Sequence, residues 1–162
     1  MNMQKLFLTF FGTGLSPKIP AQIASLLAIT VGILILRIFG METLFMLTFV
    51  TIIISIFEVN KYVAAYPKNN YEEITIDDAS GIWLSMMISL STATTLHIPY
   101  AEWIGTILAF ASFTLFQQWK PSTIGWMARK LEGGLGIVLS SVLSGIAGGL
   151  LSVIVLMGIE RL

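Results

Sequence analysis

Long apolar stretches separated by short polar connections dominate the pattern of this chain. The first two cover residues 23–39 and 43–57, and only Gly40, Met41 and Glu42 separate them. A helix that crosses a bilayer needs about 20 predominantly apolar residues. The pattern therefore predicts two spanning helices that form a hairpin.

Three more apolar stretches follow a polar segment in the middle of the chain. They cover residues 81–96, 102–119 and 135–159. The stretch 81–96 is the weakest of these because six serine and threonine hydroxyls dilute it, and such hydroxyls commonly face neighbouring helices instead of lipid. We therefore predict an all-α fold: a polytopic membrane helical bundle with four to five spanning helices, in a single membrane domain of residues 1–162.

The N-terminal part is apolar but interrupted. Residues 3–11 are too few to span a bilayer, and they suit an interfacial helix or the start of a re-entrant segment. Two glycines and two prolines between Gly12 and Pro20 predict a turn. Gly12-x-Gly14 lacks the Gly-Lys-Ser/Thr ending of a P-loop, which argues against nucleotide binding at this turn.

Composition supports a membrane protein and excludes several function classes. Hydrophobic residues make up 56% of the chain and charged residues only 11%, whereas soluble domains have about a quarter charged residues. The net charge is zero, so we expect no nucleic acid partner. The chain has no cysteine, which excludes disulfides and thiolate metal sites.

The basic residues predict an orientation in the membrane. Cytoplasmic loops of membrane proteins carry an excess of Lys and Arg. If the N-terminus is cytoplasmic, only Arg37 and Arg161 fall on the outer side, and seven basic residues fall on the inner side: Lys5, Lys18, Lys61, Lys68, Lys120, Arg129 and Lys130. The glycine-proline turn, the acidic connection before residue 81, the Lys120-Pro121 corner and the Gly133–Gly136 segment then all face the cytoplasm.

An acidic cluster stands between two of the apolar stretches. Glu72, Glu73, Asp77 and Asp78 are four of the nine acidic residues of the chain. Carboxylates close to lipid are costly and often functional, although a solvated loop explains them equally well. Asp77 and Asp78 precede a predicted helix, so they would either cap it and interact with its dipole or bind Mg²⁺ together with a substrate phosphate.

Other residues near the predicted helix ends have two interpretations each. Lys120 would contact a phosphate or extend its ammonium group to the membrane interface. Gly133-Gly134-Leu135-Gly136 would bind an anion through backbone N–H groups or mark a helix boundary. His97 lies on the outer side, remote from these groups. The four tryptophans lie near predicted boundaries and are interpreted as interface anchors: Trp83, Trp103, Trp119 and Trp126.

Several segments together resemble phosphatidylglycerophosphatase A. They are Phe11 to Pro20, Ile76-Asp77-Asp78 with Gly81, Trp119-Lys120-Pro121 and Gly133 to Gly136, in the order and spacing of that family. The resemblance implies a Mg²⁺-dependent lipid phosphatase of the bacterial inner membrane, multi-pass and with its polar motifs on the cytoplasmic side. Its substrate would be phosphatidylglycerophosphate, from which it removes the terminal phosphate to give phosphatidylglycerol.

The chain departs from the family pattern at charged positions. The family's Asp-Glu pair reads Asp77-Asp78, and its Pro-Gly-Thr reads Pro20-Ala21-Gln22. An arginine of the pattern is replaced by Thr114, and four aspartates are replaced by Gln117, Ala128, Ser140 and Ser141. Phosphoryl transfer depends on positioning and on charge stabilisation by metal and cationic groups, so these losses predict weak or absent phosphatase activity and weakened Mg²⁺ binding.

Two functional interpretations remain. By resemblance, any residual catalysis would use Asp77 and Asp78 as metal ligands and Lys120 as the phosphate contact. The alternative is a non-catalytic membrane scaffold or partner-binding protein that contacts membrane lipids. Its predicted packing surface is the small-residue face of the last stretch, at Gly145, Gly148 and Gly149. The sequence leaves the oligomeric state open.

Overall fold

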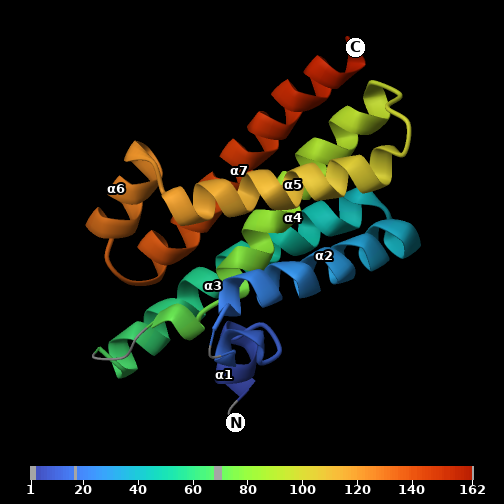
Figure 1. Ribbon diagram of the computed structural model, residues 1–162. Coiled ribbons are helices and arrows are strands. Elements are labelled where there is room, and N and C mark those ends of the chain that lie inside the picture. The colour runs from blue at the N-terminus through green and yellow to red at the C-terminus, as the bar shows by residue number, and fades with distance from the viewer. Residues whose placement is uncertain (1–2, 17, 68–70, 162) are drawn as a thin grey trace.

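The computed structural model describes residues 3–16, 18–67 and 71–161, and the regular elements in these ranges are all helical (Figure 1). This confirms the predicted all-α fold. The elements in chain order are α1 (Met3–Leu8), η1 (Thr13–Leu15), α2 (Pro20–Phe39), α3 (Met41–Ala65), η2 (Tyr71–Glu73), α4 (Ile76–Thr95), α5 (Ala101–Trp119), α6 (Ser122–Lys130) and α7 (Gly133–Glu160).

Five long helices form the bundle, and they match the five predicted stretches. By length and composition, α2, α3 and α7 are apolar enough to cross a membrane. Gly40 alone joins α2 to α3, with a positive φ of 88° that favours glycine, so the predicted hairpin is confirmed. The predicted end of the second stretch at residue 57 is wrong, because α3 continues to Ala65. The connection predicted over 120–134 contains the short helix α6.

Helix α4 occupies the centre of the bundle. It packs against α2, α3, α5 and α7, and most of its residues are buried. The prediction that its hydroxyls face other helices is confirmed for two of the six: Ser85 Oγ donates to the Ala109 carbonyl at 3.1 Å, and Ser89 Oγ donates to the Gly105 carbonyl at 2.7 Å. It is wrong for Ser91, Thr94 and Thr95, which are exposed. These contacts explain why α4 is the least apolar of the long helices.

One of the four predicted interface tryptophans lies inside the protein. Trp83 is 3% exposed, and its indole N–H donates to the Ala28 carbonyl at 2.7 Å. A Cβ on Gly32 would lie only 3.0 Å from the Trp83 ring, so the small residues of α2 make room for it. The anchor prediction for Trp83 is therefore wrong, whereas Trp103, Trp119 and Trp126 are exposed.

The glycines of α7 pack within the chain. A Cβ on Gly145 would overlap the Gly81 carbonyl oxygen of α4, and one on Gly148 would lie 2.8 Å from the Phe113 backbone nitrogen of α5. Gly149 lies against Ile88 in the same way. The predicted close approach of backbones is confirmed, but this face is covered by α4 and α5. The prediction that it offers a packing surface to a partner is therefore wrong.

The polar segments gather towards one end of the bundle. The long helices pass back and forth, so the starts of α2, α4 and α7 and the end of α5 lie towards the same end, with α6 beside them (Figure 1). The Gly40 turn and the connection that contains His97 lie at the other end.

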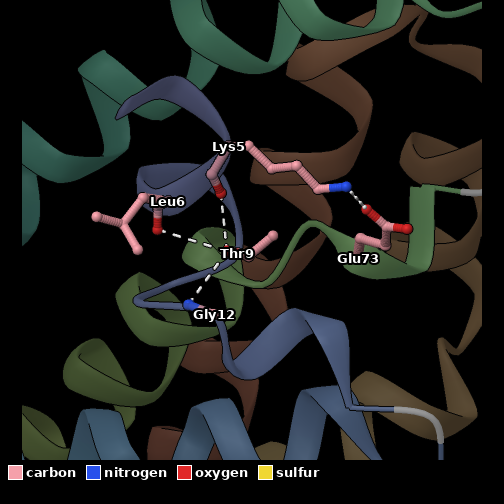
Figure 2. A network of polar contacts seen from close by, with 5 residues as sticks. All are labelled: Lys5, Leu6, Thr9, Gly12 and Glu73. Carbon is pink, nitrogen blue, oxygen red and sulfur yellow. Dashed lines mark hydrogen bonds and ion pairs between the residues drawn. The ribbon is translucent and has the colours of Figure 1, made fainter. Parts of the chain in front are cut away.

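The N-terminal segment supports the chain just before the two aspartates. Thr9 holds the segment together: its hydroxyl donates to the Lys5 carbonyl at 2.7 Å and accepts from the Gly12 N–H at 3.1 Å (Figure 2). Lys5 Nζ lies 3.1 Å from Glu73 Oε2, as Figure 2 also shows. A Cβ on Gly14 would overlap the Glu73 carbonyl oxygen. In this structure, the glycine turn therefore packs on the segment that leads into α4.

Candidate functional site

Asp77 and Asp78 lie in the first turn of α4 and are buried. Each is 4% exposed, so the solvated-loop interpretation is wrong for this pair. The cap position belongs to Thr75, whose side chain makes no capping hydrogen bond, so the aspartates do not occupy the cap position itself. Their carboxylates still lie at the end of α4 where the helix dipole favours negative charge.

Neutral side chains from two other helices hold the aspartates. The Ser141 hydroxyl of α7 donates to Asp77 Oδ2 at 2.5 Å. The Gln117 amide of α5 donates to Asp78 Oδ1 at 2.6 Å and to Ser141 Oγ at 2.9 Å. This network of Asp77, Asp78, Gln117 and Ser141, which we call the aspartate network, joins α4, α5 and α7 through side-chain hydrogen bonds.

Two buried oxygens of the aspartate network remain unpaired. Within the described ranges, Asp77 Oδ1 and Gln117 Oε1 are inaccessible to solvent and make no hydrogen bond of normal geometry. Most buried polar atoms in proteins have a partner, because leaving one unpaired costs free energy. The network therefore retains two free acceptors.

A pocket of about 380 Å³ opens beside the aspartate network. Helices α2, α4, α5, α6 and α7 and the segment before α4 line it, with these residues: Pro20, Ala21, Tyr71, Ile74, Asp77, Asp78, Gln117, Lys120, Ala128, Ile137 and Ser140. Lys120 is exposed, and it ends α5 in a left-handed conformation with a φ of 43°. The pocket thus combines buried acids with one lysine at its rim.

Burial is the main influence on the pKa values of Asp77 and Asp78, which precede the predicted span of residues 81–96. Burial raises the pKa of Asp77 above that of a free aspartate, although the Ser141 hydroxyl, the N–H groups of the first turn and the Lys120 charge act in the opposite direction. Burial and the neighbouring Asp77 raise the pKa of Asp78, against the Gln117 amide and Lys120. The two carboxyl groups therefore hold a proton more strongly than exposed ones would.

The structure brings together most of the residues that the sequence singled out. Asp77, Asp78, Lys120, Ala128 and Ser140 line one pocket, although they come from distant parts of the chain. Thr114 lies outside this pocket. It lines a narrow adjoining groove between α2 and α5 with Ala21, Gln22, Ser25, Phe113, Gln117 and Gln118.

Some contacts were not foreseen from the sequence. The direct hydrogen bonds of Gln117 and Ser141 to the aspartates are new, and so is the contact of Asn60 in α3 with the glycine-rich segment. The Gly134 N–H donates to Asn60 Oδ1 at 2.7 Å, and a Cβ on Gly134 would lie 2.5 Å from the Ile56 carbonyl oxygen. The Gly133–Gly136 segment is thus a helix start packed on α3, the second of its two interpretations.

Comparison with known proteins agrees with this arrangement. The family model "Phosphatidylglycerophosphatase A" matches residues 6–156. The chain belongs to the phosphatidylglycerophosphatase A family. It is 26% identical to phosphatidylglycerophosphatase A of Escherichia coli (strain K12) over 145 residues, which is 90% of this chain and 78% of that protein. It is also 26% identical to the Haemophilus influenzae protein of the same name over 146 residues, 90% of this chain and 84% of that one. No solved structure matches the chain significantly.

Neutral residues surround the acids at the positions where the resemblance leads us to expect aspartates. Gln117 donates a hydrogen bond to Asp78, and Ser141 donates one to Asp77. Ala128 and Ser140, at two more of these positions, line the same pocket. In the described part of the chain, no group of three or more His, Cys, Asp or Glu side chains is placed to hold a metal ion.

The Ser141→Ala substitution is expected to destabilise the protein. It leaves Asp77 Oδ2 buried without its donor, and a buried acceptor left unpaired in this way costs about 1–3 kcal/mol. Ser144→Ala is the matched control, because Ser144 is also fully buried in α7 but donates only to the Ser140 carbonyl of its own helix, at 2.9 Å. Thermal unfolding in detergent checks both variants, and equal losses would contradict a special role for the Ser141 hydrogen bond.

Proposed function

We propose that this chain is a phosphatidylglycerophosphatase A family member with weak or absent phosphatase activity. It would lie in a bacterial inner membrane with its N-terminus and pocket on the cytoplasmic side. The observation that carries the proposal is the pair of donors, Gln117 and Ser141, that point their hydrogens at the Asp77 and Asp78 carboxylates.

The donor set suits hydrogen bonding better than magnesium binding. Mg²⁺ requires oxygen ligands in near-octahedral geometry and uses carboxylates and substrate phosphates to balance its charge. Here the Gln117 amide and the Ser141 hydroxyl each occupy a carboxylate oxygen that a metal ion would otherwise contact. Among the described residues that line the pocket, Asp77 and Asp78 are the two carboxylates, so we expect Mg²⁺ binding to be weakened.

The remaining charges give little support to phosphoryl transfer. Phosphoryl transfer is catalysed by positioning and by cationic groups that stabilise charge on the transferred group. Lys120 is the cation among the pocket-lining residues, and it would contact a phosphate of the lipid headgroup. Thr114, at the family's arginine position, adds no charge. Loss of several members of a catalytic unit removes most of its rate enhancement.

The orientation follows from the distribution of basic residues. Lys120 lines the pocket, and Arg129 and Lys130 end the adjacent α6. An excess of basic residues marks the cytoplasmic side of membrane proteins. Labelling of a cysteine introduced at the exposed Thr123 of α6, by a reagent that does not cross the membrane, checks this side. Labelling of intact cells from outside would contradict it.

Phosphate release from phosphatidylglycerophosphate by the purified protein tests the proposed function. In detergent, with and without Mg²⁺, we expect release no higher than that of an Asp77→Asn variant, because the family's charged groups are missing. Robust Mg²⁺-dependent release that Asp77→Asn abolishes would contradict the proposal and would assign Asp77 as a metal ligand. Robust release that Asp77→Asn leaves unchanged would contradict both the proposal and that assignment.

A further inference from the structure

We propose that an apolar cavity beneath the N-terminal segment, residues 3–15, holds one acyl chain of a membrane phospholipid. This N-terminal cavity has a volume of about 360 Å³ and lies between the segment, the hairpin of α2 and α3, and α4. Among the described residues, none lines both this cavity and the pocket beside the aspartate network. The inference is therefore independent of the proposed loss of phosphatase activity, and it concerns a resident lipid instead of a substrate.

The lining of the N-terminal cavity favours a hydrocarbon ligand. Thr51 carries the one hydroxyl among the described lining residues, and the indole N–H of Trp83 already donates to the Ala28 carbonyl at 2.7 Å. A buried water needs about two to four polar partners, whereas apolar cavities of about 150 Å³ stay dry and bind small hydrocarbons. The N-terminal cavity is larger than that, so part of an acyl chain fits in it.

The cavity lies at the level of the hydrocarbon core of a bilayer. Val31 is near the middle of α2, and Leu47 and Thr51 lie in the apolar part of α3, and both helices are apolar enough to cross a membrane. Gln4 of α1 donates to the Glu58 carbonyl, in the polar extension of α3, at 3.4 Å. The chain after Gln4 therefore enters the apolar level of the bundle. Acyl chains are the groups that a bilayer supplies at this level.

The cavity opens to the lipid-facing surface of the bundle. Phe11 is 71% exposed and Leu47 is 38% exposed, although both line the cavity. Val50 and Ile54, which follow Leu47 on the same face of α3, are exposed as well. A phospholipid can therefore insert one chain beside these side chains, while its second chain and its headgroup stay outside.

A strained turn forms one wall of the cavity. Phe10 and Phe11 both have positive φ angles, 41° and 59°, which bulky residues rarely adopt. The Phe10 ring is buried and packs edge-on against Trp83, with the ring centroids 6.2 Å apart. Strained backbone persists where the surrounding structure fixes it, and it is concentrated at sites that include ligand clamps. The turn is thus held in place beside the cavity instead of collapsing into it.

Quenching of Trp83 fluorescence tests the inference, because Trp83 lines the cavity. Replacing Trp103, Trp119 and Trp126 by phenylalanine leaves Trp83 as the one tryptophan of the chain. The protein is placed in vesicles of phosphatidylcholine whose acyl chains are brominated near their middle, since bromine quenches an indole only at short range. We expect Trp83 to lose most of its fluorescence, although its side chain is buried. Fluorescence equal to that in unbrominated vesicles would overturn the proposal.

Variants that fill the cavity locate the quenching chain. Val31→Phe and Thr51→Leu enlarge side chains on two different helices that line the cavity, and each is expected to lose most of the quenching. Leu34→Phe is the matched control for Val31→Phe, because Leu34 is an exposed residue of α2 outside the cavity lining, and it should keep the quenching. Quenching that persists in both filled variants would place the brominated chains on the outer surface of the bundle and overturn the proposal.

A comparison of headgroups shows whether the acyl chain is what the cavity recognises. Phosphatidylcholine and phosphatidylglycerol with the same brominated chains are expected to quench Trp83 equally, because the described residues that line the cavity are uncharged. Quenching by only one of the two lipids would overturn recognition through the chain. A cavity closed by a protein partner would leave Trp83 unquenched by both, which would also overturn the proposal. These readouts do not involve phosphate release, so their failure leaves the proposed function unaffected.

Discussion

Restoring the family's charged residues is expected to raise Mg²⁺-dependent phosphate release by about 10³-fold or more. Removing members of a catalytic unit from other enzymes lowers their rates by a factor of this size. The variant combines Thr114→Arg, Gln117→Asp, Ala128→Asp, Ser140→Asp and Ser141→Asp. At residues 117 and 141 it replaces hydrogen-bond donors by acceptors, so that carboxylates from α4, α5, α6 and α7 meet around one pocket. Phosphate release from phosphatidylglycerophosphate, with and without Mg²⁺, measures the gain.

A second measurement separates metal binding from catalysis. Several carboxylates in one buried site repel each other, so the restored variant should unfold at a lower temperature than the original chain in EDTA. Mg²⁺ should then stabilise the variant and leave the original chain nearly unchanged, because a ligand stabilises only a protein that binds it. Asp77→Asn in the restored variant is the control, and it should remove both the activity and the stabilisation.

Two outcomes would contradict the expected Mg²⁺-dependent activity of the restored variant. A restored variant that Mg²⁺ stabilises but that releases no phosphate would leave the metal site in place and refute phosphatidylglycerophosphate as the substrate of this scaffold. A restored variant with the stability and inactivity of the original chain, in EDTA and in Mg²⁺, would show that residues 117, 128, 140 and 141 do not form a metal site together.

Apolar length predicted the helices well, and it predicted their ends less well. The end of α3 carries Glu58, Asn60 and Lys61, which resemble a loop in composition but continue the helix beyond the apolar stretch. Lys61 and Glu58 form an ion pair at 2.6 Å within that extension. Helix α6 lies between a proline and a pair of glycines, and its nine residues were too few for a recognisable apolar pattern.

Helix contacts explain what the sequence could not predict about the site. Asp77, Asp78 and Lys120 stand out by charge in an apolar chain, and all three line the pocket. Their hydrogen-bond partners do not stand out, because Gln117 is 39 residues from Asp78 and Ser141 is 64 residues from Asp77. Only the packing of α4 against α5 and α7 decides which polar side chains meet. The same packing buries Trp83. Its position near a predicted helix end gave no sign of this burial.

That packing depends on glycine where α4 and α7 cross, and Gly145→Ala is expected to lower the free energy of unfolding by about 1–3 kcal/mol or more. A Cβ on Gly145 would overlap the Gly81 carbonyl oxygen, and one on Gly81 would lie 2.6 Å from the Ser141 carbonyl oxygen. Because both obstacles are backbone atoms, a side-chain movement cannot relieve them, and the helices must separate.

Gly158→Ala is the matched control for this substitution, because Gly158 lies in the same helix with nothing within 4 Å of an added Cβ. There the gain in helix propensity should stabilise the protein by about 0.5–1 kcal/mol. Thermal unfolding in detergent measures both variants. Separation of α4 from α7 would also pull Ser141 away from Asp77 and so remove a hydrogen bond of the aspartate network. A Gly145→Ala variant as stable as the original chain would refute the close crossing of α4 and α7 and, with it, the aspartate network built across that crossing.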